Sequence, residues 1–277
     1  MTVLESFILG LAQGLTEFLP VSSSGHLALL EHFFGIEEGN VVSFAVLLHV
    51  GTLFSIFAVY YREIWNLILE LLAVIRDVVR GRGPQINLNE TRRLGFLIIA
   101  ATLPTVLIGL LFQDLVSKLY GTLFAIGAGL VITGTVLFVS ERVAPGVRGV
   151  KDMKFRHAVF VGILQSVALC PGISRSGSTI VGGLFAGLTR EFAVRFAFLI
   201  SIPSVLGAVV LEAPDAFRGG MDAAMLLPVI VGVAVSALSG FFAIKTMIRI
   251  VSGKKLYYFS FYTWALGAAV VAYHFFG

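Results

Sequence analysis

Two short polar segments interrupt a chain that is otherwise strongly apolar. The first carries Glu17, three consecutive serines at 22–24, and His26. A histidine or a carboxylate beside a serine hydroxyl can remove its proton, so these residue types at this spacing predict general-base or nucleophilic chemistry. Glu17 could orient His26, act as the base itself, or bind a divalent metal ion. Gln13 lies one helical turn before Glu17, so its amide oxygen could join the same cluster.

The second segment carries Arg175 between two serines and two residues before a predicted helix start at Gly177. An arginine at membrane depth costs about 2.5–3.5 kcal/mol unless it is paired or hydrated. Its rigid fork of donors suits two oxygens of a phosphate, and helix N-termini, here and at Gly25, attract anions. These features predict a diphosphate site. The alternative is that Arg175 only pairs with Glu17.

The two polar segments are related copies. Without a gap, residues 10–47 align with residues 162–199 at eleven identical positions, which include a glutamine and a Ser-x-Ser-Gly sequence. A shared apolar composition would not supply those polar matches. The copies are not equivalent, because Leu169 stands in the second where Glu17 stands in the first. This asymmetry predicts one reaction centre rather than two equal ligand sites.

The elements that position these segments are predicted to be membrane helices. Hydrophobic residues make up 57% of the 277 residues and charged residues only 13%, which is about half the charged share of a soluble domain. A span needs about 20 apolar residues. Residues 63–80 are apolar enough to suggest a further span. A crossing there would move the later basic loops to the other side of the membrane, so we expect an interfacial or cytoplasmic helix. The six predicted spans are 41–61, 94–112, 119–140, 190–211, 223–248 and 256–276.

The apolar runs around the polar segments are too short to cross a membrane. Residues 1–35 and 157–188 are therefore predicted to form two re-entrant helical hairpins. Each repeat, 1–140 and 153–277, then holds one hairpin and three spans, and this odd number of crossings gives an inverted-topology repeat whose two tips meet near the midplane. The predicted fold is an all-α polytopic membrane protein. With these six spans, 17 of the 20 Lys and Arg residues lie on one side of the membrane, and this side should be cytoplasmic.

Other features of the sequence limit the possible partners and functions. The single cysteine, Cys170, excludes an internal disulfide. The basic residues lie in short loops, which argues against nucleic acid as a partner. His49 lies within a predicted span and is interpreted as an interhelical hydrogen-bonding residue. An inverted repeat also fits a transporter for a lipid carrier or an anion, but a pure carrier has no use for a Ser/His/Glu cluster on one tip only.

The polar segments resemble those of the bacterial undecaprenyl-diphosphate phosphatases of the bacitracin-resistance type. The motifs that carry the resemblance are Gln13-x3-Glu17, Pro20-Val-Ser-Ser-Ser-Gly-His26 and Pro171-Gly-Ile-Ser-Arg-Ser-Gly177. The similarity runs through nearly the whole length. The first position of the Glu/Gln element is Gln13 here, which puts more weight on Glu17 alone.

This resemblance implies an integral membrane hydrolase that converts undecaprenyl diphosphate to undecaprenyl phosphate and inorganic phosphate. The activity recycles the lipid carrier for cell-wall synthesis and confers bacitracin resistance. It also implies a divalent cation, Mg²⁺ or Ca²⁺, and a place in the bacterial plasma (inner) membrane with the active site open to the outside. The expected partners are the isoprenyl diphosphate substrate and membrane lipids, and a homodimer is left open.

By residue match, Glu17, Ser23, His26 and Arg175 inherit the catalytic assignments. The expected mechanism has Ser23 attack the terminal phosphorus with His26 as base, and direct attack by water or by His26 is the alternative. A metal would lie near Glu17 and Gln13. The expected phosphate-binding residues are Ser22, Ser24, Gly25, Ser174, Ser176 and Gly177.

Overall fold

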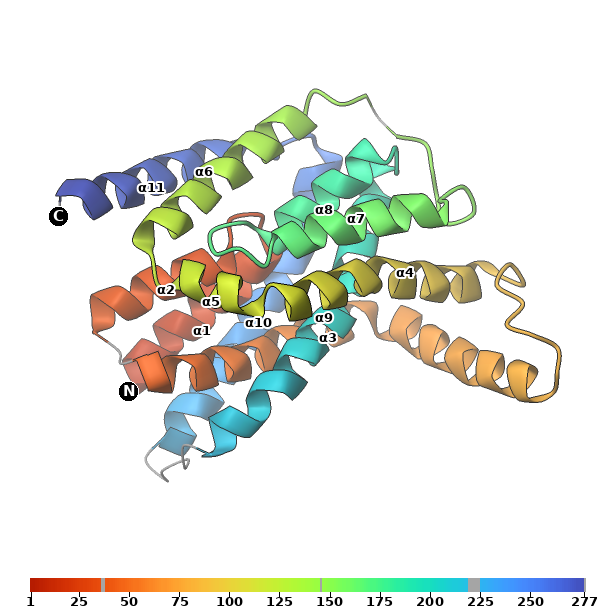
Figure 1. Cartoon of the computed structure of the whole chain (residues 1–277), viewed down its shortest axis with the longest axis horizontal. Coiled ribbons are helices and arrows are strands. Elements are labelled where there is room, and N and C mark those ends of the chain that lie inside the picture. Colours follow the sequence, from red (N-terminus) through yellow and green to blue (C-terminus); the bar gives the residue numbers. More distant parts are fainter. Residues whose placement is uncertain (36–37, 145, 219–224, 277) are drawn as a thin grey trace.

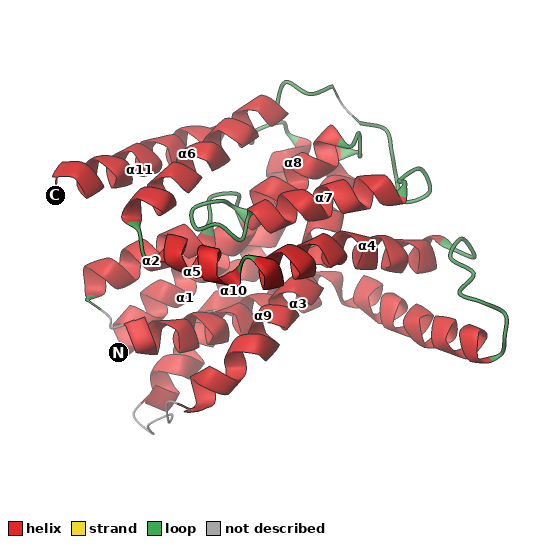
Figure 2. Ribbon diagram, viewed as in Figure 1, coloured by secondary structure: helices red, strands yellow, loops and turns green. Residues whose placement is uncertain are grey.

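The computed structural model describes residues 1–35, 38–144, 146–218 and 225–276. Within these ranges the regular structure is all helical, and loops join the helices (Figure 2). The all-α prediction is therefore confirmed. Figure 1 shows the helices in chain order as α1 (Val3–Phe18), α2 (Ser23–Phe34), α3 (Glu38–Val79), α4 (Glu90–Leu111), α5 (Gln113–Tyr120), α6 (Leu123–Ser140), α7 (Phe155–Val167), α8 (Arg175–Phe185), α9 (Arg190–Arg218), α10 (Leu226–Ser252) and α11 (Tyr257–Phe276).

Six segments in the described residues are long and apolar enough to cross a membrane. They correspond one to one to the six predicted spans, so the polytopic prediction is also confirmed. The predicted first residues of the fifth span, 223 and 224, lie outside the described residues. The six segments are Phe44–Val79, Glu90–Leu111, Leu123–Ser140, Arg190–Leu211, Leu226–Ser252 and Tyr257–Phe276.

Helix α3 runs further than the predicted span. It continues past a kink at Tyr60 (φ −109°, ψ 23°) to Val79, and Figure 1 shows its last part as an arm beside the start of α4. Arg92 of α4 is buried and holds this arm, because its guanidinium lies 2.8 Å from Glu70 and 3.0 Å from Asp77. Residues 63–79 are thus helical, and their position relative to a membrane stays a prediction.

The basic segments of the chain meet at one end of the molecule. Arg93 donates to the carbonyl oxygen of Met153 at 2.7 Å. Arg190 lies 2.8 Å from Glu141, and the same carboxylate accepts from the backbone N–H of Leu256. Segments that are far apart in the sequence and rich in Lys and Arg therefore share one end, as the charge pattern requires if that end is to face the cytoplasm.

Two aligned glycines allow each half of the chain to pack closely on the other. A Cβ placed on Gly10 of α1 would lie 2.5 Å from the carbonyl oxygen of Gly232 in α10. A Cβ placed on Gly162 of α7 would lie 2.1 Å from the carbonyl oxygen of Ala101 in α4. Aligned positions in the two copies thus both allow a close contact between helices. The division into two repeats and their inverted orientation stay predictions.

Helix α6 carries the second polar loop. A Cβ at Gly129 would lie 2.3 Å from the carbonyl oxygen of Pro171, so only a glycine admits the loop there. Gly172 adopts φ +81°, a conformation that favours glycine. The Thr133 hydroxyl donates to the carbonyl oxygen of Gly172 and accepts from the backbone N–H of Ser174, each at 3.0 Å. The start of α8 is therefore set by its contact with α6.

Replacing Gly129 with valine should displace this loop. We expect the free energy of unfolding to fall by about 1–3 kcal/mol, as overpacking at a close contact usually costs, and phosphate release per folded molecule to fall with it. The melting temperature in detergent and the specific activity measure the two effects. Gly207→Val is the matched control, since a Cβ at Gly207 has nothing within 4 Å. Equal behaviour of the two variants would contradict the packing argument.

Candidate active site

The first polar loop ends in a strained turn that starts α2. Pro20 follows the end of α1 and prevents the helix from continuing. Ser22 has φ +70°, which is unusual for a residue with a side chain. Its hydroxyl accepts from the backbone N–H of Gly25 at 3.3 Å and lies 3.2 Å from the hydroxyl of Ser24. Ser22 is therefore the N-cap of α2, and the turn fixes where Ser23 points.

The second polar loop starts α8 with the same hydrogen bonds. The Ser174 hydroxyl accepts from the backbone N–H of Gly177 at 3.1 Å and lies 3.2 Å from the hydroxyl of Ser176. The repeated Ser-x-Ser-Gly sequence thus encodes a helix N-cap. Ser22 and Ser174 are only 2% and 1% exposed, so these two hydroxyls are buried within their caps.

The two loops are in direct contact. The Ser176 hydroxyl donates to the carbonyl oxygen of Leu19 at 3.2 Å. A Cβ on Gly177 would lie 3.3 Å from the Cβ of Pro20, and one on Gly25 would lie 3.4 Å from the Cα of Gly172. Two loops that are offset by 152 positions in the alignment therefore lie together and form one composite site.

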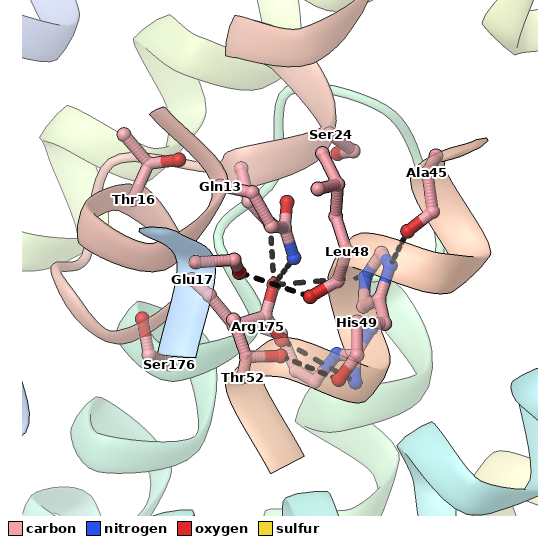
Figure 3. Close-up of polar contacts among 12 residues, drawn as sticks. Gln13, Thr16, Glu17, Ser24, Ala45, Leu48, His49, Thr52, Arg175 and Ser176 are labelled. Atoms are coloured by element: carbon pink, nitrogen blue, oxygen red, sulfur yellow. Dashed lines mark hydrogen bonds and ion pairs between the residues drawn. The ribbon is translucent and has the colours of Figure 1, made fainter. Parts of the chain in front are cut away.

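Glu17 lies at the centre of this site. Its Oε2 accepts a 2.6 Å hydrogen bond from the Ser23 hydroxyl and a 3.1 Å bond from the amide of Gln13, one turn earlier on α1 (Figure 3). The side chain is only 6% exposed. A carboxylate buried near a helix C-terminus needs such partners, because both burial and the helix dipole disfavour its charge.

Two further side chains approach the same carboxylate from other helices. The Nη1 atom of Arg175 on α8 lies 3.8 Å from Oε1 of Glu17, and the Nε2 atom of His49 on α3 lies 3.7 Å from Oε2. Figure 3 shows these three side chains directed toward one another. Sequence reasoning placed His49 between helices but outside the site. The signal that could have included it is a polar residue inside an otherwise apolar predicted span.

The guanidinium of Arg175 has hydrogen-bond donors that are not used within the described part of the protein. Among the described residues, its guanidinium makes no hydrogen bond, and its Nη1 is buried without a partner. The 3.8 Å separation from Glu17 is longer than a hydrogen bond. The fork can therefore bind two oxygens of an anion without breaking an existing hydrogen bond. A small cavity beside it is lined by Glu17, Phe18, Arg175, Ser176, Thr179, Ala197, Phe198 and Ser201.

The structure places both ring nitrogens of His26 against partners other than the Ser23 hydroxyl. The Nδ1 of His26 lies 2.7 Å from the carbonyl oxygen of Ser22, and its Nε2 lies 2.7 Å from the hydroxyl of Tyr262 on α11. The imidazole turns back toward the N-cap, whereas the Ser23 hydroxyl donates to Glu17. The role of His26 as base stays a prediction, and the carboxylate that accepts from Ser23 in this structure is that of Glu17. Tyr262 carries no sequence signal, because it stands among other aromatic residues.

Gln13 and Glu17 also fit the expected divalent cation. The Oε1 of Gln13 is buried without a partner among the described residues, and a metal would give this oxygen one. The described residues contain no group of three or more His, Cys, Asp or Glu that could hold a metal alone. Mg²⁺ is often bound by one or two carboxylates together with substrate phosphates. The donor set therefore suits a cation shared between the protein and a diphosphate.

Several known proteins are similar to this chain over nearly their whole length. The model of the family described as bacitracin resistance protein BacA matches residues 6–269. An undecaprenyl-diphosphatase of Alkaliphilus metalliredigens is 50% identical over 271 residues, which cover 98% of each chain. Proteins of the same name are 43% identical in Carboxydothermus hydrogenoformans (98% of this chain, 97% of that one) and 40% identical in Methanosphaera stadtmanae (98% of each). The chain therefore belongs to the BacA family of bacitracin resistance proteins.

Proposed function

We propose that this protein is a multi-pass membrane phosphatase that hydrolyses undecaprenyl diphosphate to undecaprenyl phosphate and inorganic phosphate. The observation that carries the proposal is a guanidinium with free donors beside a serine whose hydroxyl donates to a buried carboxylate. The relatives named above are diphosphatases. Nothing in these observations supports the alternative of a transporter.

The reaction begins at Ser23. Its oxygen attacks the terminal phosphorus, and its proton passes to Oε2 of Glu17 along the 2.6 Å hydrogen bond. The bond between that phosphorus and the bridging oxygen breaks, and Glu17 returns the proton to the departing undecaprenyl phosphate. Water then attacks the phosphoserine and gives its proton to Glu17. The bond between phosphorus and the serine oxygen breaks, and Glu17 passes this proton to that oxygen, so that inorganic phosphate is released and the serine is restored. Direct attack by water or by His26 is the alternative.

The second loop and the N-termini of α2 and α8 bind the substrate. Arg175 holds two oxygens of the terminal phosphate, and the N-termini of α2 and α8 add the positive ends of their dipoles. Ser24 and Ser176 contribute hydroxyls, with backbone N–H groups near Gly25 and Gly177. Glu17 and Gln13 would hold the divalent cation, which would neutralise charge on the diphosphate.

The setting follows from the charge pattern. The basic end faces the cytoplasm of a bacterial plasma membrane, which leaves the site open to the outside. Hydrolysis on that side recycles the lipid carrier for cell-wall synthesis and confers resistance to bacitracin. A homodimer stays a prediction that cross-linking in native membranes would test.

The purified protein in detergent is expected to release phosphate from undecaprenyl diphosphate. This release should stop when EDTA is added and resume when Mg²⁺ or Ca²⁺ is supplied.

Gln13→Ala should raise the cation concentration that gives half-maximal activity, because it removes the side-chain oxygen that has no partner among the described residues. Gln165→Ala is the matched control, since the oxygen of the aligned Gln165 is also buried without a partner among the described residues, but its amide nitrogen donates to Thr105 and Ser204 and not to a carboxylate. Lipid binding by the folded protein without phosphate release would refute the phosphatase. An equal cation requirement in both variants would refute the metal site.

A further inference from the structure

Tyr262 connects the last helix of the chain to the first polar loop. Its hydroxyl lies 2.7 Å from Nε2 of His26, 236 positions earlier in the sequence. The two rings are nearly parallel, with an interplanar angle of 13° and centroids 5.7 Å apart. Helix α11 packs closely on α6, where a Cβ at Gly267 would lie 2.7 Å from the carbonyl oxygen of Gly127. The helix that supports the second loop therefore also holds Tyr262 against the first.

The hydrogen bonds of His26 fix which nitrogen carries the proton. The carbonyl oxygen of Ser22, 2.7 Å from Nδ1, can only accept, so Nδ1 must bear the hydrogen. In a neutral imidazole, Nε2 is then an acceptor, and the Tyr262 hydroxyl donates to it. Both ring nitrogens are thus used, and neither orientation nor tautomer is free to change while Tyr262 stays in place.

His26 in turn braces the strained serine turn. The carbonyl oxygen of Ser22 accepts from the ring Nδ1–H at 2.7 Å and from the backbone N–H of His26 at 3.2 Å. Ser22 is the residue with φ +70°, a conformation that persists only when its surroundings hold it. Ser23 follows it directly, with its hydroxyl on Glu17. A shift of the imidazole would therefore release the turn that aims Ser23.

We propose that Tyr262 is a positioning residue of this active site. Its hydroxyl and ring hold His26 against the Ser22 carbonyl, and this keeps Ser23 directed at Glu17. Tyr262 acts through His26 and does not contact the reacting atoms. Its effect on rate rests on the proposed phosphatase function, whereas its effect on the tautomer of His26 does not.

The kinetic test compares two replacements. Tyr262→Phe removes the hydroxyl and keeps the ring, and we expect kcat to fall about 3- to 10-fold, the factor that one lost neutral hydrogen bond gives. Tyr262→Leu removes both and should lower kcat further. KM should change little in either, because the phosphate ligands are untouched. A loss that appears mainly in KM would overturn the positioning role.

The spectroscopic test uses nitrogen-15 NMR of labelled histidines, with the His26 signal assigned by its loss in His26→Gln. The wild type should show the Nδ1–H tautomer, and Tyr262→Phe should populate the Nε2–H tautomer. Tyr273→Phe is the matched control, since Tyr273 also lies on α11 with its ring near a histidine, His32. An Nε2–H tautomer in the wild type, or identical spectra and kcat in the two phenylalanine variants, would overturn the proposal. A wild type without phosphate release would refute the phosphatase, while the spectra still decide the Tyr262 contact.

Discussion

Replacing Arg175 with alanine is expected to lower kcat/KM for phosphate release by about 100- to 1,000-fold, the usual loss when a preorganised donor to a developing charge is removed. The guanidinium has no hydrogen bond among the described residues, so its donors are already available to the substrate. Arg175→Lys should recover only part of the activity, because an ammonium keeps the charge but cannot bind two oxygens in a plane. Rates are measured with undecaprenyl diphosphate and normalised to folded protein.

A second arginine separates this role from simple ion pairing. Arg195 lies 2.7 Å from Glu63, and neither residue belongs to the two loops, so Arg195→Ala removes an ion pair and should leave activity per folded molecule near that of the wild type. If Arg175→Ala also kept its kcat/KM and lost only thermal stability, Arg175 would be a partner of Glu17 and not a phosphate ligand.

The fold was the most predictable part of this molecule. Spans follow from apolar length, because a segment in lipid must satisfy its own backbone hydrogen bonds. The helix starts at both loops were predicted to within two residues, at Gly25 and Gly177, whereas the helices begin at Ser23 and Arg175, after the capping hydroxyls of Ser22 and Ser174. The continuation of α3 did not follow. It depends on Arg92 burying its charge between Glu70 and Asp77, and such a pairing between separate helices has no periodic signal.

The side-chain pairs within the site were the least predictable. Residues Ser23 and His26 are close in sequence, yet the turn at Ser22 sends them to different partners. The deciding contact for His26 comes from Tyr262, at the other end of the chain. Proximity in sequence thus identified which residues gather, whereas the local backbone and a distant helix decided which atoms meet.

Glu17→Gln is expected to lower kcat by about 100- to 10,000-fold, the range for loss of a positioned general base. An amide cannot accept the proton that the Ser23 hydroxyl now donates at 2.6 Å. Because Gln is nearly the same size, the site should stay assembled and still bind the diphosphate. Wild-type activity in Glu17→Gln would transfer the base role to another group. Substrate binding and single-turnover rates, measured separately, distinguish loss of chemistry from loss of binding.

The same site makes a sharper prediction about the covalent intermediate. With substrate labelled at its terminal phosphorus, rapid acid quenching should trap label on Ser23, since an acid-stable phosphoserine forms before water attacks it. Ser23→Ala should carry no label and lose turnover, whereas Ser24→Ala, one residue along the same turn, should keep the label with a smaller loss of rate. His26→Ala should label slowly but at the same serine, because in this structure the imidazole holds the turn. Label that survives an alkaline quench but is lost in acid, and that disappears in His26→Ala, would make the imidazole the nucleophile, and full turnover of Ser23→Ala without label under either quench would make it water.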